Sequence, residues 1–330
     1  MGKAIRVSGL TKFYGDLLAV DHISFEVEEG EIFGLLGPNG AGKTTTIKML
    51  TTLLRPSDGT AEVCGYDIQK EPDAVRRVIG IVFQEPSLDL ELTGRENMEF
   101  HARLYDVPKG EMDARIEELL QLVELQDWAD RLVRNYSGGM RRRLEIARSL
   151  LHHPRVLFLD EPTLGLDPQS RRHVWSYISR INREEGVTII LTTHYMEEAD
   201  QLCDRVAIID KGRIVALDTP EKLKGIVGGD VLTLEVGPEA KRLMEAIRRR
   251  GLARNIQMLR GQITLMEKDG EALIPVLLRL AEEVGVPVNS VSLRKPSLDD
   301  VFLYFTGERI RSQGPEPMMM WRMRMMRRGR

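Results

Sequence analysis

The sequence is poor in cysteine and has no long apolar run. Two cysteines in 330 residues, Cys64 and Cys203, exclude a disulfide framework and predict a reduced, cytosolic compartment. No apolar stretch approaches the roughly 18 residues that a membrane-spanning helix needs. The N-terminus leads into a strand pattern without the apolar core of a signal peptide. We therefore expect any membrane role to be peripheral, on the cytoplasmic face.

The sequence also lacks an excess of charge of one sign. It contains 47 lysines and arginines against 50 aspartates and glutamates, so no global basic field indicates a nucleic-acid partner. Basic residues do gather at the end, where residues 318–330 contain five arginines and no acid. We predict a disordered tail over residues 311–330, with a basic contact to anionic lipid or to a partner protein as the alternative.

The strongest motif is a glycine-rich segment between a predicted strand and a predicted helix. The apolar run 32–36 indicates a buried strand, residues 45–50 indicate a helix, and the segment between them fits the P-loop pattern. Its glycines let backbone N–H groups surround phosphate oxygens, and the helix N-terminus adds a positive dipole. We expect Lys43 to reach the β- and γ-phosphates and the Thr44 hydroxyl to bind Mg²⁺. The predicted nucleotide-binding residues of this loop are Gly37, Pro38, Asn39, Gly40, Ala41, Gly42, Lys43, Thr44 and Thr45.

Two carboxylates follow a second apolar run. Residues 156–159 lead to Asp160, as expected for a parallel strand with an acid at its carboxyl edge, and Glu161 follows directly. Asp160 is predicted to hold Mg²⁺ through water, and Glu161 to act as a general base or to polarise water. A solvated turn with two acids is the alternative, which the P-loop in the same chain disfavours.

Weaker signals surround these motifs. Tyr14 either stacks on an adenine ring or packs at a strand edge, and Gln84, at the end of a strand, is a candidate to reach Mg²⁺ or the attacking water. Ser137-Gly138-Gly139, here called the signature segment, begins a helix and offers either an anion site or a simple N-cap. His194 follows a buried strand at the edge where phosphates are expected, so we predict a γ-phosphate contact.

Taken in order along residues 1–222, these features resemble the nucleotide-binding subunit of ABC transporters. The resemblance assigns Tyr14 to the adenine-stacking aromatic, Gly37 to Thr45 to Walker A, Gln84 to the Q-loop, the signature segment to LSGGQ, Asp160 and Glu161 to Walker B and the catalytic glutamate, Asp167 to the D-loop, and His194 to the switch histidine. A P-loop alone fits many nucleotide hydrolases, whereas this order of elements is specific.

Two positions depart from that family's signature. Tyr136 stands for its Leu and Met140 for its Gln, and a Met cannot make a polar contact to nucleotide. This form resembles the daunorubicin-resistance type of exporter ATPase, as does the run from Asp299 to Gly307 near the end of the chain.

The resemblance implies a subunit that hydrolyses ATP with Mg²⁺ and powers export of a drug-like, lipid-like or other hydrophobic substrate through a separate permease. Two copies are expected to pack head to tail on ATP, so that the signature segment of one completes the phosphate site of the other. The permease contact is expected around residues 85–92.

One alternative is a soluble ABC ATPase acting on ribosomes or nucleic acid, although the usual tandem cassettes or long coiled-coil insert are missing from the sequence. Another is a non-hydrolysing nucleotide sensor, which the complete catalytic set disfavours.

The expected fold class is α/β, with a P-loop ABC ATPase core over residues 1–222 that includes an antiparallel β subdomain and a helical subdomain near residues 85–150. A small α+β domain over residues 223–310 follows. Its pattern of strand 231–236, helix 239–250, strand 262–266, helix 271–284 and strand 289–293 indicates a βαβαβ order of ferredoxin-like kind. Ser297 to Asp300 resembles a helix-capping start. We expect a structural or dimer-supporting role for this domain.

Overall fold

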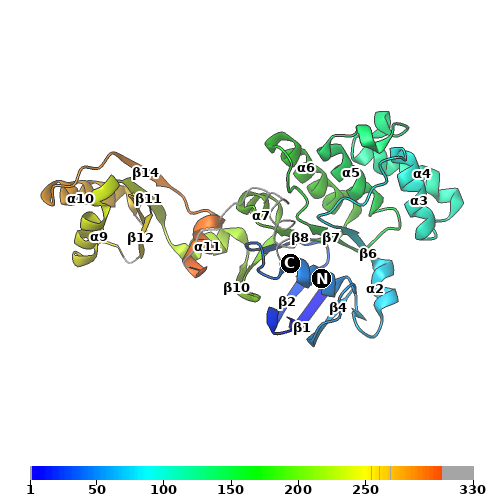
Figure 1. Cartoon of the computed structure of the whole chain (residues 1–330), viewed down its shortest axis with the longest axis horizontal. Coiled ribbons are helices and arrows are strands. Elements are labelled where there is room, and N and C mark those ends of the chain that lie inside the picture. The colour runs from blue at the N-terminus through cyan, green and yellow to red at the C-terminus, as the bar shows by residue number, and fades with distance from the viewer. Residues whose placement is uncertain (1, 254, 260, 268, 307–330) are drawn as a thin grey trace, which may run out of the picture.

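The computed structural model describes residues 2–253, 255–259, 261–267 and 269–306. The predicted tail over residues 311–330 lies outside the described residues. Three sheets organise the described chain, one of six strands and two of four. The six-stranded sheet and the first four-stranded sheet lie together, and the last sheet lies at the opposite end of the molecule (Figure 1). Within the described ranges, no helix combines the length and the apolar character needed to cross a membrane.

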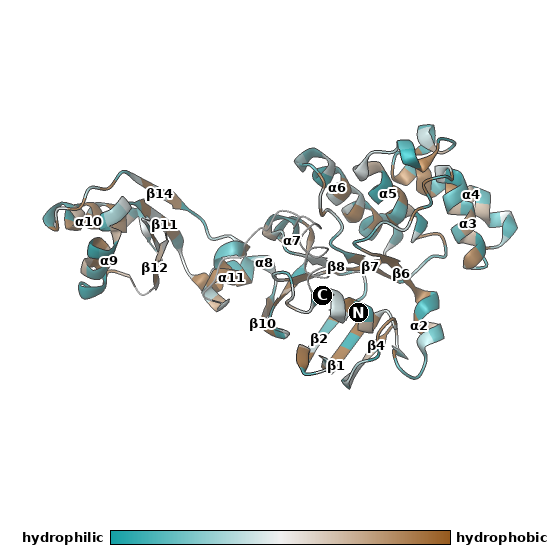
Figure 2. Ribbon diagram, in the orientation of Figure 1, coloured by the Kyte–Doolittle hydropathy of each residue, from teal (hydrophilic) through white to brown (hydrophobic). Residues whose placement is uncertain are grey.

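The six-stranded sheet forms the centre of the fold. Its order is β10-β9-β3-β8-β7-β6, and all neighbours are parallel except the antiparallel edge strand β10. The strands are β3 (Ile32–Leu36), β6 (Ile79–Val82), β7 (Val156–Asp160), β8 (Thr188–Thr193), β9 (Arg205–Asp210) and β10 (Arg213–Asp218). β3, β7 and β8 are buried along their whole length, as parallel strands covered on both faces are, and Figure 2 shows the apolar character of this sheet. The carboxyl ends of β3, β6, β7 and β8 therefore share one edge.

An antiparallel sheet of order β2-β1-β4-β5 packs against the P-loop helix. Its strands are β1 (Lys3–Tyr14), β2 (Leu17–Glu28), β4 (Asp58–Val63) and β5 (Tyr66–Asp67). Buried and exposed residues largely alternate along β1 and β2. Ile5 of β1 shares a core with Ile47 of α1 (Lys43–Leu50) and with Phe33 and Phe158 of the central sheet. The predicted antiparallel strands are confirmed.

Helices fill the intervals between the central strands. They are α2 (Pro72–Val78), α3 (Gly94–Leu104), α4 (Lys109–Leu122), α5 (Gly138–Arg148), α6 (Pro168–Glu185), α7 (Met196–Leu202) and α8 (Pro220–Val227). α3, α4 and α5 pack together, where the sequence predicted a group of helices, and share a core that includes Met98, Ile116 and Leu144. A capping box between Thr93 and Glu96 begins α3.

The last sheet has the order β12-β13-β11-β14 with every pair antiparallel. Its strands are β11 (Asp230–Glu235), β12 (Asn255–Leu259), β13 (Gln262–Glu267) and β14 (Ser290–Arg294), with helices α9 (Ala240–Arg249) and α10 (Gly270–Glu283) packed against it. The element order is βαββαβ, which is the ferredoxin-like arrangement with one strand more than predicted. β12 was missed because a five-residue edge strand, paired on one side only, leaves a weak apolar pattern.

The helix α11 (Leu298–Thr306) returns to the first part of the chain. Leu298, Val301 and Phe302 are buried in the same apolar cluster as Leu223 of α8, and Figure 2 shows α11 beside α8. The Asp300 carboxylate accepts hydrogen bonds from the Ser297 amide and hydroxyl, each 2.8 Å long, as the capping pattern predicted.

Candidate functional site

The predicted phosphate-binding loop connects β3 to α1 at the carboxyl edge of the central sheet. Gly42 has a φ of 104°, a backbone conformation that favours glycine. Gly37 lies so close to β9 that a Cβ atom would be 2.3 Å from the Ile209 carbonyl oxygen. Glycine is therefore required at both ends of the turn, which brings Lys43 to the first position of the helix.

Lys43 is buried beneath this loop. Its Nζ donates hydrogen bonds to the carbonyl oxygens of Gly37 (2.7 Å) and Pro38 (3.2 Å), and lies 3.3 Å from Glu161 Oε1. Burial lowers the pKa of the Lys43 ammonium, and the nearby carboxylates oppose this only in part. The side chain is thus a positive charge held inside the loop by two carbonyl oxygens and the Glu161 carboxylate.

Asp160 and Thr44 place two oxygen ligands side by side. Thr44 Oγ1 donates to Asp160 Oδ1 at 3.1 Å, and the Thr192 hydroxyl donates to the same oxygen. A hydroxyl and a carboxylate suit Mg²⁺, which binds through few protein ligands and keeps several waters or phosphate oxygens. The described part of the chain has no cluster of three or more His, Cys, Asp or Glu side chains suited to a metal ion. The donor set therefore fits a nucleotide-associated cation better than a protein-enclosed one.

Glu161 lies between Lys43 and His194. His194 Nδ1 is 2.6 Å from Glu161 Oε2, and the Glu161 side chain is only 8% exposed. Burial raises the pKa of this carboxyl group, but the His194 hydrogen bond and the Lys43 charge outweigh burial and hold the pKa below its usual value. Glu161 is therefore ionised at neutral pH, as a proton acceptor or a water-orienting group requires.

The backbone at Glu161 is constrained. Its φ is 49°, an uncommon conformation for a residue with a side chain. Its N–H donates to both the carbonyl oxygen (3.1 Å) and the hydroxyl (3.0 Å) of Thr192 on β8. A neighbouring strand thus fixes the direction in which the carboxylate leaves the chain.

The signature segment begins α5 as a helix N-cap. The Ser137 hydroxyl accepts a hydrogen bond from Met140 N at 3.2 Å, and a Cβ on Gly138 would lie 3.5 Å from Leu166 in the loop before α6. Asp167 caps α6 by accepting from the amides of Gln169 and Ser170. The signature segment and the predicted D-loop are therefore neighbours within one chain.

The two substituted signature positions take part in packing within the chain. Met140 packs against the main apolar cluster. Tyr136 is buried, donates its hydroxyl to Trp128 O at 2.6 Å and meets the Trp128 ring edge-on. Both residues therefore support packing of the helices, and the signature segment lies at the start of α5.

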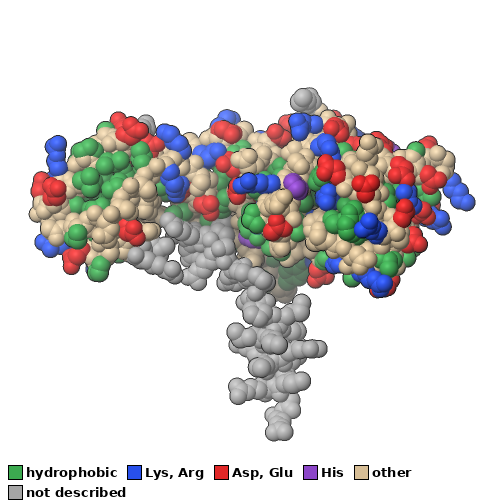
Figure 3. Space-filling view, turned by 90° about the horizontal axis from the view of Figure 1, so that it is seen from above, with side chains coloured by type: hydrophobic (Ala, Val, Ile, Leu, Met, Phe, Trp, Pro, Cys, Tyr) green, Lys and Arg blue, Asp and Glu red, His purple; other side chains and the backbone are tan. Residues whose placement is uncertain are grey.

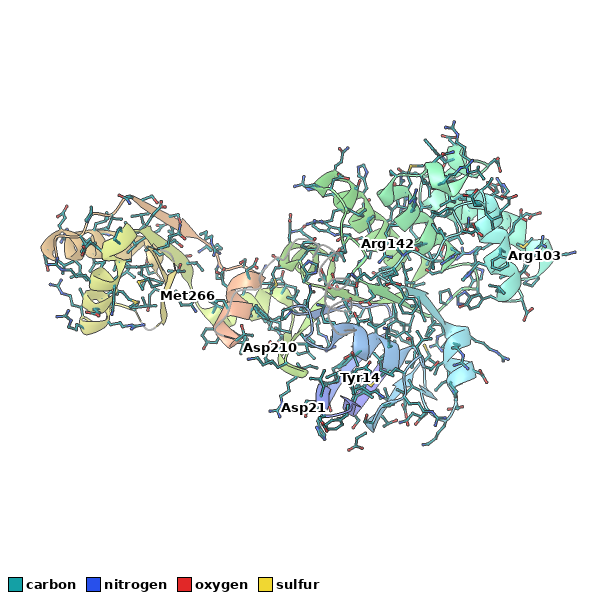
Figure 4. All side chains as sticks on the ribbon, viewed as in Figure 1. Tyr14, Asp21, Arg103, Arg142, Asp210 and Met266 are labelled. Carbon is teal, nitrogen blue, oxygen red and sulfur yellow. The ribbon has the colours of Figure 1, made fainter. Side chains whose placement is uncertain are left out.

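Two predicted site residues lie at the periphery of this cluster. Tyr14 ends β1 with its side chain 47% exposed, and Figure 4 shows it at the antiparallel sheet. Gln84 is exposed just beyond β6. Across the described ranges, no hydrogen bond or ion pair joins Tyr14, Gln84 or Ser137 to the cluster of Lys43, Glu161 and His194.

Two polar residues in contact with the site were missed in the sequence. The Thr192 hydroxyl donates a hydrogen bond to Asp160 and accepts one from the Glu161 amide. In the sequence, Thr192 is visible only as part of the end of an apolar strand. Arg142 donates to the carbonyl oxygens of Asp160 and Pro162, but it lies in a run of three arginines that pattern alone does not distinguish. A usable signal is the spacing of Arg142 and Glu145, which places opposite charges on one face of α5.

Comparison with known proteins points to the ABC transporter family, which the sequence motifs resemble. The ABC transporter family profile matches residues 20–164. The chain is 44% identical to the daunorubicin resistance ATP-binding protein DrrA3 of Streptomyces coeruleorubidus, over 92% of this chain and 96% of that one. It is 38% identical to the linearmycin resistance ATP-binding protein LnrL of Bacillus subtilis, over 93% and 99% of the two chains.

Solved structures agree on the fold. CbiO1 of Clostridium perfringens, part of the ABC transporter complex cbiONQ, matches with a TM-score of 0.64 and 27% identity over 76% of this chain and 97% of that one. The dimeric ATP-binding cassette MJ0796, in a post-hydrolysis state with ADP and Pi, matches with a TM-score of 0.59 and 27% identity over 65% and 98%. With 44% identity along nearly its whole length and a match to the family profile, this chain belongs to the ATP-binding subunits of ABC transporters.

Proposed function

We propose that this ATP-hydrolysing subunit powers export of a hydrophobic, drug-like or lipid-like compound through a separate permease, on the cytoplasmic face of the membrane. The observation that carries the proposal is the buried cluster of Lys43, Glu161 and His194 in a chain so similar to drug-resistance ATP-binding proteins. The names of those relatives support the substrate class. The alternative of a soluble ATPase acting on ribosomes or nucleic acid is not favoured by them.

For the chemical step, we propose three roles around the γ-phosphate. Lys43 exchanges its loop carbonyl partners for phosphate oxygens and offsets the charge that develops on them. Glu161 accepts a hydrogen bond from the attacking water and orients it in line with the leaving group. His194 stays hydrogen-bonded to Glu161 through Nδ1 and offers its other ring nitrogen to the γ-phosphate. The loop amides from Gly37 to Thr45 bind the remaining phosphate oxygens.

Thr44 and Asp160 are the residues that would hold Mg²⁺, with Gln84 approaching from the end of β6. The ion would supply positive charge that neutralises the phosphates. Tyr14 is proposed to stack on the adenine ring, because its exposed aromatic face leaves room for a flat partner.

We further propose a head-to-tail homodimer. Ser137 and the amides of Gly138 and Gly139 lie at a helix N-terminus, where backbone donors and the helix dipole favour an anion. In this arrangement they meet the γ-phosphate held by Lys43 of the other subunit, and Asp167 lies next to the shared interface. ATP is then required for dimer formation, and hydrolysis releases the two subunits.

We also propose that the chain divides into two functional units. Residues 1–222 carry the nucleotide site, and residues 223–310 supply a ferredoxin-like accessory unit with a structural or dimer-supporting role. Figure 3 shows hydrophobic side chains gathered at the end of the molecule where this unit lies. In the same unit, Val276 and Leu278 of α10 are exposed.

The variant Glu161→Gln tests the catalytic assignment. The amide keeps the shape of the side chain but cannot accept a proton, so we expect ATP hydrolysis to fall by about 100-fold or more while ATP binding and ATP-dependent dimers persist. Phosphate release and size-exclusion chromatography with MgATP measure the two properties. Glu184→Gln, an exposed glutamate on α6, is the matched control and should behave as wild type; near-normal hydrolysis by Glu161→Gln would contradict the proposal.

A further inference from the structure

Arg142 of α5 is buried against backbone carbonyls of two other segments. Its Nε donates to Pro162 O at 2.8 Å, Nη2 to Asp160 O at 3.0 Å and Nη1 to Phe83 O at 2.6 Å. Only 7% of the residue is exposed, and Figure 4 shows it between α5 and the central sheet. One guanidinium group thereby joins the helix of the signature segment to the residues that follow β6 and β7.

Glu145, one turn further along α5, extends this set of contacts. Its Oε2 accepts from Arg142 Nη1 at 3.2 Å, and its Oε1 accepts from the Ser87 amide at 2.7 Å. Ser87 lies within residues 85–92, the segment proposed to meet the permease. A continuous chain of hydrogen bonds therefore runs from Ser87 through Glu145 and Arg142 to the carbonyls of Asp160 and Pro162.

Those two carbonyls lie on either side of the catalytic glutamate. Because the Glu161 N–H is held by Thr192 and its φ is 49°, we expect a shift of the Asp160 and Pro162 carbonyls to rotate the backbone of Glu161, which lies between them. Such a rotation changes the distance between the carboxylate and Lys43. The position of residues 85–92 is thus mechanically connected to the orientation of the catalytic carboxylate.

A contribution to folding stability does not by itself account for the buried ion pair of Arg142 and Glu145. A buried ion pair can often be replaced by apolar residues of similar volume with no loss of stability. The neighbouring Arg143 shows the contrast, because it donates to Val123 O and to the Tyr177 hydroxyl and so stays among the helices. Of the three consecutive arginines, Arg142 is the one whose hydrogen bonds reach the ends of the catalytic strands.

We propose that Arg142 and Glu145 are positioning residues that couple residues 85–92 to Glu161, so that a partner seated on that segment sets the rate of hydrolysis. The coupling to a partner rests on the proposed function; the link between the two segments does not. Arg142 donates hydrogen bonds to the carbonyls on both sides of Glu161. Glu145 accepts hydrogen bonds from both Arg142 and the Ser87 amide, and so links the two segments.

The double variant Arg142→Met/Glu145→Leu tests the link in the full chain. It removes both charges at similar volume but also removes the hydrogen bonds to the Asp160 and Pro162 carbonyls, so the melting temperature should fall modestly while the chain stays folded. We expect the KM for ATP to change little and kcat to fall on the order of 100-fold, as for a misplaced catalytic group. Arg143→Met is the matched control on the same helix. A kcat that falls no further than in the control, or a rise in KM with kcat unchanged, would overturn the proposal.

Amide hydrogen exchange separates coupling from a general loss of order. In wild type, adding MgATP should slow exchange in residues 85–90 and in residues 161–164 together. In the double variant the second segment should still respond while the first no longer does, and Arg143→Met should respond as wild type. A joint response that survives in the double variant would overturn the link. Since the chain is measured alone, these results stand whether or not a permease is found.

Discussion

At the scale of single residues, the surroundings of Glu161 have opposing effects on the charge of its carboxylate. Its carboxylate is buried, which disfavours charge, yet it contacts His194 and Lys43, which favour charge more strongly. The consequence is a carboxylate that is ionised and oriented before nucleotide arrives. The same contacts connect folding stability to pH.

Because the pKa of Glu161 is lower in the folded chain than its usual value of 4.5, its ionised form contributes stability above pH 4.5. That contribution is lost as the pH falls through the lower, folded pKa. We therefore expect Glu161→Gln to be less stable than wild type at pH 7 and the difference to vanish in acid. Urea unfolding of both proteins between pH 3 and 7 measures it, with Glu184→Gln as control. A difference that is constant over this range would contradict the account.

A second residue-scale prediction concerns the substituted signature position Tyr136. A Cβ on Gly94 would lie 2.4 Å from the Tyr136 hydroxyl but 3.2 Å or more from other atoms. Gly94→Ala should therefore destabilise the chain, and Tyr136→Phe should cost about 1 kcal/mol for the lost hydrogen bond to Trp128. Because removing the hydroxyl also removes the clash, the double variant should be more stable than the sum of the single effects. Thermal unfolding of wild type, the two single variants and the double variant measures this double-mutant cycle. Strictly additive effects would show that the Tyr136 hydroxyl is not what a side chain at position 94 clashes with.

At the scale of elements, α5 makes two kinds of contact in successive turns. Its first turn presents Ser137 and the signature glycines, and its second turn carries Arg142 and Glu145 to the catalytic strands. A single rigid helix thus connects the surface proposed to meet the second subunit with the interior of its own site.

Ser137→Asp separates the cap from the proposed phosphate contact. Asp is as good an N-cap as Ser, so the stability of the chain should be retained, whereas Ser137→Ala should lose about 1 kcal/mol. The added negative charge would face the γ-phosphate of the other subunit, so ATP-dependent dimers should be lost in Ser137→Asp. Light scattering with MgATP in the Glu161→Gln background measures this. Dimers that form normally with Asp at this position would place the signature segment away from the phosphate.

The sequence predicted four of the six central strands, β3, β6, β7 and β8, and the phosphate loop, because their patterns are local. Apolar runs such as 32–36 and 156–159, followed by glycines or acids, determine both the strand and what lies at its carboxyl edge. What it missed depends on contacts between distant segments. Thr192 and Arg142 act through backbone carbonyls and amides elsewhere in the chain, and β12 gains its register only by pairing with β13.

At the scale of the whole molecule, the chain has a nucleotide site at one end and an accessory sheet at the other (Figure 1). α11 joins the two, because Phe302 and Val301 pack with Leu223 of α8 in the main core. Charged side chains of both signs are interspersed over the face in Figure 3. A local docking surface is thus a better basis for a partner than a general electrostatic attraction.

The most direct test of the proposed function is capture of the partner. The Glu161→Gln chain, held in its ATP state, is isolated with MgATP from solubilised host membranes, and the co-purifying proteins are identified by mass spectrometry. The account predicts a membrane protein with several spans in near-equal amount, retained with ATP and reduced with ADP. Recovery of ribosomes or nucleic acid instead, or of the chain alone in the soluble fraction, would contradict it.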